Sequence, residues 1–160
     1  MIPHIVIRTD GAARGNPGPA SLGAALIDGS RDDARHPSAP PDATISQALG
    51  VQTNNVAEWT GVIEALKLAV RLGAQVVDMY LDSKLIVEQL HGRWRVKDAK
   101  LQPLWADAKA ILAGFARWSA THVPRAQNSA ADSLANEALD RVAAGGPARV
   151  ARARLAPPGA

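Results

Sequence analysis

The spacing of apolar residues changes several times along the chain, and each change marks a different kind of element. Short apolar or alternating runs bounded by Gly, Pro, Asn or Asp are typical of strands. We expect strands over residues 4–9, 21–27, 43–51, 75–81 and 115–123. Apolar residues that recur at helical spacing form one buried stripe. We expect helices over residues 55–72, 83–90, 101–113 and 129–143.

Local signals mark the ends of these elements. Thr53 or Asn54 offers an N-cap to the first helix, and Gly73 marks its end. Residues 11–19 contain three glycines and two prolines, which predicts a turn between the first two strands. Residues 28–42 are polar and rich in proline, so we expect an exposed loop there.

The order of the elements predicts the fold class. Three strands close together in sequence favour an antiparallel meander, whereas strands reached through a helix favour parallel crossovers. We therefore expect an α/β domain over residues 1–144, with a mixed five-stranded sheet flanked by helices. Residues 145–160 are rich in Ala, Pro, Gly and Arg and have no periodic apolar face, which predicts a disordered basic tail.

Composition narrows the chemistry. The chain has 160 residues, which suits one domain, and its 47% apolar content is normal for a globular protein. It has no cysteine, which excludes disulfides, cysteine-bound zinc and thiol catalysis. No stretch approaches the length of a membrane span, and residues 1–10 lack the features of a signal peptide. We therefore expect a cytoplasmic protein.

The positive charge is confined to one end of the chain. The net charge is +3, and residues 145–160 carry three arginines and no acid, so residues 1–144 balance to zero. A nucleic acid would therefore be bound through a local patch or through bound cations.

Two aspartates follow predicted strands. Asp10 ends the first strand and Asp82 ends the fourth, and ligands of open α/β sheets bind just beyond such strand ends. If the two strands are neighbours, the carboxylates lie side by side and raise each other's pKa. A divalent cation removes that repulsion, and hard oxygen ligands suit Mg²⁺ or Mn²⁺.

Two further acids lie near the beginnings of helices. Glu58 and Asp132 could reach the same strand ends, and four carboxylates there could hold two ions about 3.5–4 Å apart. Each acid also has a simpler interpretation: a turn residue for Asp10, part of a helix cap for Asp82, and solvated first-turn acids for the other two. Spacing alone leaves both interpretations open.

Four strings of residues resemble the ribonuclease H type I family and occur in the family's order. They are residues 9–19 (TDGAARGNPGP), Thr53-Asn54-Asn55 with Glu58, Leu81-Asp82-Ser83, and residues 132–138 (DSLANEA). The resemblance spans residues 3–143. It implies the mixed sheet described above, a catalytic and metal-binding quartet of Asp10, Glu58, Asp82 and Asp132, and hydrolysis of the RNA strand of RNA–DNA hybrids.

The resemblance also implies a mechanism with two Mg²⁺ ions, for which Mn²⁺ can substitute. Asp10 would bridge both ions, Glu58 and Asp82 would complete the ion near the leaving oxygen, and Asp132 would help to hold the ion that activates water. The products would carry 5′-phosphate and 3′-hydroxyl ends, and the working form would be a monomer.

Several polar residues are candidate substrate contacts. Asn16, Asn54 and Asn55 match family positions that contact the substrate backbone, although turn and cap chemistry would also explain them. Many family members carry a histidine in the loop before the last carboxylate; here the loop has none, and we expect Arg125 to substitute in catalysis. The remaining candidates are Arg14, Asn128 and the basic cluster Arg93, Arg95 and Lys97.

The cluster includes Trp94, which we expect mostly in the core, with the cations partly functional; the alternative interpretation of the cluster is a solvated linker with the same tryptophan packed in the core. Trp59, Trp105 and Trp118 are also expected in the core, and His122 is expected to be structural or on the surface.

Two other functions remain open: a nuclease of the same superfamily with another substrate, and a non-catalytic nucleic-acid binding module. A nucleotide-binding site is disfavoured, because the glycines lack the dinucleotide fingerprint and the chain has no GKS or GKT string.

Overall fold

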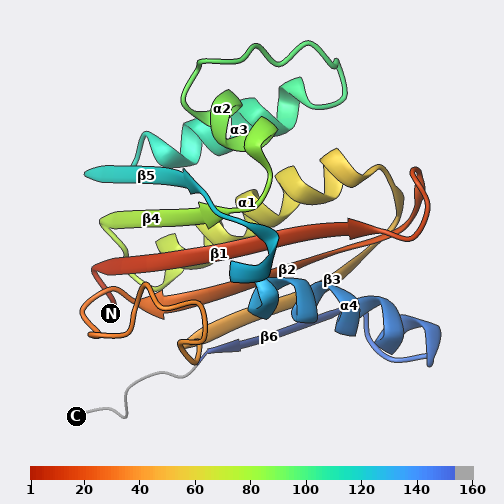
Figure 1. Cartoon of the computed structure of the whole chain (residues 1–160), viewed down its shortest axis with the longest axis horizontal. Coiled ribbons are helices and arrows are strands. Elements are labelled where there is room, and N and C mark those ends of the chain that lie inside the picture. The colour runs from red at the N-terminus through yellow and green to blue at the C-terminus, as the bar shows by residue number, and fades with distance from the viewer. Residues whose placement is uncertain (154–160) are drawn as a thin grey trace.

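One six-stranded sheet organises the computed structural model, which describes residues 1–153 (Figure 1). The strands lie in the order β5-β4-β1-β2-β3-β6. Their bounds are β1 His4–Ala13, β2 Gly18–Asp28, β3 Ala43–Gln52, β4 Val76–Leu81, β5 Arg117–His122 and β6 Arg149–Ala153. The helices are α1 Asn54–Arg71, α2 Lys84–Leu90, α3 Gln102–Leu112 and α4 Ser129–Ala143, and Arg125–Gln127 forms the 3₁₀ turn η1.

The sheet is mixed as predicted. β1, β2 and β3 form an antiparallel meander, and β4 and β5 extend it in parallel from the other side of β1. The predicted fold class is confirmed, although the sheet has six strands and not five. The predicted turn over residues 11–19 is shorter than expected, because Gly11, Ala12 and Ala13 continue the pairing of β1 with β2.

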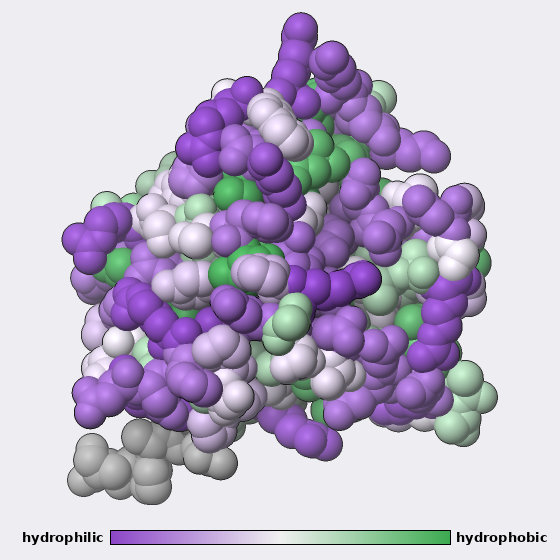
Figure 2. Space-filling model, viewed as in Figure 1, coloured by the Kyte–Doolittle hydropathy of each residue, from purple (hydrophilic) through white to green (hydrophobic). Residues whose placement is uncertain are grey.

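Helices cover both faces of this sheet. The main core lies between one face and helices α1, α2 and α3, and its largest buried side chain is that of Trp59. Helix α4 packs on the other face against β2 and β3 (Figure 1). Beside α4, Val6 and Ile27 form a small second cluster under the loop between β2 and β3. Figure 2 shows that hydrophilic residues cover most of the face seen in Figure 1.

Strand β6 contradicts the predicted disordered tail. Residues 149–153 pair antiparallel with β3, from Gln47 opposite Arg149 to Ala43 opposite Ala153. All but one of the side chains of β6 are exposed, so the strand depends on backbone hydrogen bonds and leaves no apolar period in the sequence. Residues 154–160, the rest of the predicted tail, lie outside the described residues.

Arg141 of α4 holds the approach to this strand. Its guanidinium donates to the carbonyls of Pro147 at 2.7 Å, Ala148 at 3.3 Å and Ser46 at 2.8 Å. We expect Arg141→Ala to destabilise the protein by roughly 1.5–3 kcal/mol, because bonds from a charged donor contribute about that much. Denaturant unfolding measures this change, and hydrogen exchange should show faster exchange at β6. Equal protection of β6 in both proteins would contradict the assignment.

No helix among residues 1–153 combines the length and the apolar character that crossing a membrane requires.

Candidate active site

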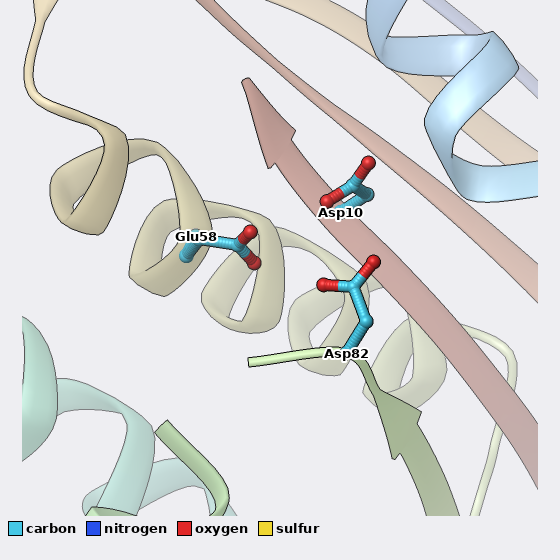
Figure 3. Close-up of side chains that lie close together, drawn as sticks. All are labelled: Asp10, Glu58 and Asp82. Carbon is cyan, nitrogen blue, oxygen red and sulfur yellow. The ribbon is translucent and has the colours of Figure 1, made fainter. Parts of the chain in front are cut away.

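Three carboxylates from three separate elements point toward one another at the end of the sheet. Asp10 lies in β1, Glu58 in the second turn of α1, and Asp82 directly after β4 (Figure 3). One oxygen from each lies within 4.8 Å of the others. This arrangement brings together three of the four predicted metal ligands.

The end of β4 opens a gap beside Asp10. The last pair between β1 and β4 joins Thr9 to Leu81, so Asp10 has a strand neighbour only on its other side, where it faces Gly23. Glu58 belongs to α1, which lies on the opposite face of the sheet from α4, and its side chain reaches Asp10 through this gap. Asp10 is only 2% exposed and Glu58 only 8% exposed.

Two glycines let the acid-bearing helices approach the sheet closely. A Cβ on Gly11 would lie 2.7 Å from the Cα of Glu58, against the backbone of α1. A Cβ on Gly23 would lie 2.7 Å from the amide nitrogen of Ala135, against the backbone of α4. Real Cβ atoms essentially never come so close, so a side chain at either position would push a helix, and its carboxylate, away from Asp10.

Burial and mutual repulsion raise the pKa of the Asp10 and Glu58 carboxyl groups. Burial, then the charge of Asp82 and a carboxyl–carboxyl hydrogen bond with Asp132, raise the pKa of Asp10 to about 7. Burial, then the charges of Asp10 and Asp82, raise the pKa of Glu58 well above its usual value. Such a cluster is unfavourable when fully ionised unless a cation neutralises it.

Asp132 approaches Asp10 from the first turn of α4. It lies outside the tight group of three, but it is close enough to hydrogen bond with the Asp10 carboxyl and to raise the pKa of that group. The side-chain amide of Asn136, one turn later, donates to the backbone carbonyl of Asp132 at 3.1 Å. The fourth predicted ligand therefore also faces Asp10.

Neither Glu58 nor Asp82 takes the simpler role that its position suggested. Glu58 is not a solvated first-turn acid, because it lies in the second turn of α1 and is only 8% exposed. Thr53 caps α1 by accepting from the amide of Val56 at 3.3 Å, and Ser83 caps α2 by accepting from the amide of Ile86 at 3.3 Å. Glu58 and Asp82 are therefore free of capping. Buried carboxylate oxygens that repel one another are the donor set that Mg²⁺ and Mn²⁺ prefer, so the site fits a divalent metal.

Comparisons with known proteins agree with this geometry. A family model described as reverse transcriptase-like matches residues 8–138. Ribonuclease H of Polaromonas naphthalenivorans is 36% identical over 155 residues, which cover 86% of this chain and 88% of that protein. Ribonuclease HI of Halobacterium salinarum is 43% identical over 131 residues, and the matched region is 82% of this chain and 62% of that protein. This chain belongs to the ribonuclease H type I family.

Some of the relatives that this chain resembles are much longer than the chain. A bifunctional protein of Mycobacterium tuberculosis is 45% identical over 139 residues, which are 87% of this chain but 36% of that protein. The solved N-terminal RNase H domain from that organism superposes with a TM-score of 0.76 at 45% identity, covering 84% of this chain and 97% of the solved chain. LC11-RNase H1, solved in complex with an RNA/DNA hybrid, is 35% identical with a TM-score of 0.76, covering 87% and 99%.

The carboxylate cluster lies beside a groove of about 270 Å³. The groove is lined by Asn54, Asn55, Glu58, Asp82, Ser83 and Arg125. Asn16 supports this wall, because its Oδ1 accepts from the backbone amide of Asn54 at 3.1 Å. The fold therefore brings Asn54, Asn55 and Arg125 to the carboxylates. Their contact with substrate stays a prediction.

The other predicted cations lie elsewhere on the ribonuclease H fold. Arg14 pairs with Asp140 of α4 at 2.7 Å. Arg93 and Arg95 line a separate cavity of about 620 Å³ between α2 and α3, and Lys97 is exposed on the same loop.

The tryptophans follow the prediction with one exception. Trp94 was expected in the core but is 44% exposed, because it follows the end of α2, where the Lys84 ammonium lies 5.8 Å from its ring centre. Trp59 is fully buried, and Trp105 and Trp118 pack against the core. His122 is exposed at the end of β5, as expected.

The structure contradicts a substrate contact for Asn128. Its side chain has no exposed surface and donates to the carbonyl of Thr9 at 2.8 Å and to Asp82 Oδ2 at 3.2 Å. Sequence reasoning also missed Arg8, which is 3% exposed and donates to the carbonyl of Gln127 at 3.0 Å. A charged residue inside the apolar run of residues 5–9 was the available signal.

The raised pKa of Asp10 predicts how metal and pH act on stability. The folded state holds a proton on Asp10 up to about pH 7, whereas the unfolded chain releases it near 3.8. This group therefore favours folding fully below about pH 4, and its contribution is lost as the pH rises through 7. Metal ligands must be deprotonated, so Mg²⁺ should raise the melting temperature more at about pH 8 than at about pH 5.

Differential scanning calorimetry with Mg²⁺ or EDTA at the two pH values measures this difference. An equal Mg²⁺ effect at both pH values would argue against metal binding at Asp10.

Proposed function

We propose that this chain is an endoribonuclease that hydrolyses the RNA strand of RNA–DNA hybrids and leaves 5′-phosphate and 3′-hydroxyl ends. The observation that carries the proposal is the convergence of Asp10, Glu58 and Asp82 within 4.8 Å of one another, with two of them buried, in a ribonuclease H type I chain. A similar protein, LC11-RNase H1, has been solved with an RNA/DNA hybrid.

The carboxylates would hold two Mg²⁺ ions, with Mn²⁺ as a substitute. Asp10 would be the central ligand, because it faces the other three acids, and Glu58, Asp82 and Asp132 would hold the metal with it. Bound in this way, the ions would supply a nucleophile with a lowered pKa and stabilise the charge that develops on the phosphate.

The reaction is a substitution at phosphorus. A water oxygen forms the new bond to phosphorus and loses a proton, the bond from phosphorus to the 3′ oxygen of the RNA breaks, and that oxygen takes up a proton. Arg125, which lines the same groove as Asn54 and Asn55, would donate to the phosphate being attacked. A guanidinium is well suited to this because it is always charged and binds phosphate with two donors.

Selectivity for a hybrid needs groups that sense the RNA 2′-hydroxyl, which both donates and accepts hydrogen bonds. The side-chain amides of Asn54 and Asn55 have that capacity and are exposed at the start of α1. Asn16 would act with them, partly by fixing the backbone of Asn54.

More distant contacts would grip the backbone of the substrate. Arg93, Arg95 and Lys97 lie exposed between α2 and α3, and Arg14 lies beside α4. Phosphate contacts from these cations would make affinity fall with increasing salt. One chain supplies all four carboxylates, so a monomer is the expected working form.

A panel of labelled substrates tests the proposed activity. We expect the chain with Mg²⁺ to cut the RNA of an RNA–DNA hybrid and to leave duplex DNA intact. End mapping of the products should detect 5′-phosphates. Cleavage of duplex DNA or a branched junction in preference to the hybrid would indicate a superfamily nuclease of another kind. Tight hybrid binding without metal-dependent cleavage would indicate a binding module.

A further inference from the structure

Two buried side chains join the middle of β1 to the turn that precedes α4. The Nδ2 atom of Asn128 donates to the carbonyl of Thr9 at 2.8 Å, and a guanidinium nitrogen of Arg8 donates to the carbonyl of Gln127 at 3.0 Å. Consecutive residues of β1 are thus bonded to consecutive residues of the turn, once in each direction. We call this pair of links, made by Arg8 and Asn128, the clasp.

Asn128 contacts the segments that carry three of the four acids. Thr9, which accepts from it, is the residue before Asp10. Asp82 also accepts from its Nδ2 at 3.2 Å. The backbone amide of Asp132 donates to the carbonyl of Asn128 at 3.1 Å, in the first turn of α4. The Asn128 side chain has no exposed surface, so it contacts the cluster from the protein interior and not through the groove.

Arg8 also bonds to the loop between β2 and β3. Its second guanidinium bond goes to the carbonyl of Arg35 at 3.0 Å, and its charge lies 4.8 Å from the ring centre of Tyr80. Within residues 1–153 it pairs with no carboxylate, and burial lowers its pKa. A buried cation of this kind contributes little through ion pairing, so its two carbonyl bonds are what it supplies to the structure.

We propose that the clasp positions Asp82 and Asp132 for metal binding, with Asn128 as a positioning residue that touches neither substrate nor reacting atoms. The inference rests on the proposed function only in assigning the metal to these carboxylates. Without Asn128, the Asp82 carboxylate could rotate and α4 could begin in another direction. Substitution of a residue that orients a metal ligand typically lowers metal affinity 10- to 100-fold.

Calorimetric titration with Mn²⁺, in the absence of substrate, tests this role directly. We expect Asn128→Ala to weaken Mn²⁺ binding about 10- to 100-fold while the protein stays folded. Arg8→Met keeps the apolar stem and should weaken binding by a smaller factor, roughly 3- to 10-fold, because only one of its two lost hydrogen bonds goes to the turn before α4. Arg8→Met also carries the test if Asn128→Ala does not fold.

Ser21→Ala is the matched control. The Ser21 hydroxyl is buried in β2 and donates to the carbonyl of Ala135 at 2.6 Å, so it anchors the same helix about two turns beyond the clasp. If the clasp acts only by docking α4, this substitution should weaken Mn²⁺ binding as much as Asn128→Ala does. We expect it to lower the melting temperature and leave Mn²⁺ affinity within about twofold of the wild type.

Steady-state kinetics on a hybrid separates positioning from substrate contact. For Asn128→Ala we expect an unchanged KM for hybrid at saturating metal and a higher metal requirement for half-maximal rate. Wild-type Mn²⁺ affinity in a folded Asn128→Ala protein would overturn the inference, as would a raised KM with unchanged Mn²⁺ affinity. If the wild type cleaves no hybrid but binds Mn²⁺ more tightly than Asn128→Ala, the proposed function fails and the clasp stands.

Discussion

Asp10→Asn should abolish cleavage and stabilise the metal-free protein at the same time. The amide keeps the shape of the carboxylate but is a poor metal ligand, so we expect kcat/KM to fall by about 10³-fold or more. Above about pH 7 the wild type holds an ionised Asp10 against the charges of Asp82 and Asp132 in a buried site. The amide removes that repulsion, so its melting temperature in EDTA should exceed the wild-type value.

Asp107→Asn is the control for this prediction, because Asp107 is exposed on α3, away from the carboxylates. It should change neither activity nor stability appreciably. In the presence of Mg²⁺ the difference in melting temperature between Asp10→Asn and the wild type should become smaller or change sign, since only the wild type is stabilised by bound metal. If Asp10→Asn destabilises the metal-free protein at about pH 8, then repulsion between ionised Asp10 and the neighbouring carboxylates does not destabilise the wild type, whatever happens to activity.

Gly11→Ala should damage both the fold and the activity. The added methyl group would lie 2.5 Å from the carbonyl carbon of Ala57 and 2.7 Å from the Cα of Glu58, and this backbone cannot rotate away as a side chain could. Helix α1 must shift outward. We expect a loss of roughly 3 kcal/mol in the free energy of unfolding, at the upper end for overpacked cores. A displacement of about 1 Å at Glu58 should lower activity about 100-fold.

Gly61→Ala provides the matched comparison within the same helix. A Cβ there would make ordinary contacts, the nearest at 3.5 Å, and alanine favours helix more than glycine does. This substitution should be neutral or stabilising by up to about 1 kcal/mol, with activity retained. Denaturant unfolding and hybrid cleavage of the two variants compare them directly. Equal behaviour would show that close approach of α1 to β1 does not position Glu58.

Much of the fold follows from patterns that the sequence displays openly. The helix Ser129–Ala143 has its predicted bounds because its apolar stripe and its flanking residues are both clear. The neighbouring positions of Asp10 and Asp82 follow from strand order, since β4 lies parallel beside β1 and its last residue, Leu81, pairs with Thr9. Asp132 was harder to place, because reaching Asp10 depends on how closely α4 approaches Gly23.

Features decided by tertiary contact were predicted least well. β6 escaped prediction because backbone pairing alone forms it, and its exposed arginines resemble those of a solvated tail. A polar amide in a loop predicts a substrate contact at Asn128, because nothing in the sequence shows that this side chain turns inward. Only the packing of β1 beside β4 creates the two acceptors that draw it there. Trp94 shows the reverse case, an aromatic residue that the loop leaves exposed.

The central claim is that these carboxylates make the chain a metal-dependent ribonuclease H. The most direct measurement is cleavage of an RNA–DNA hybrid, labelled on its RNA strand, by the wild type with Mg²⁺, Mn²⁺ or EDTA, beside Asp10→Asn. We expect cutting of the RNA strand with either metal, none in EDTA, and none by the variant. Cutting that persists in EDTA or in Asp10→Asn, or no cutting by a folded wild type with either metal, would contradict this claim.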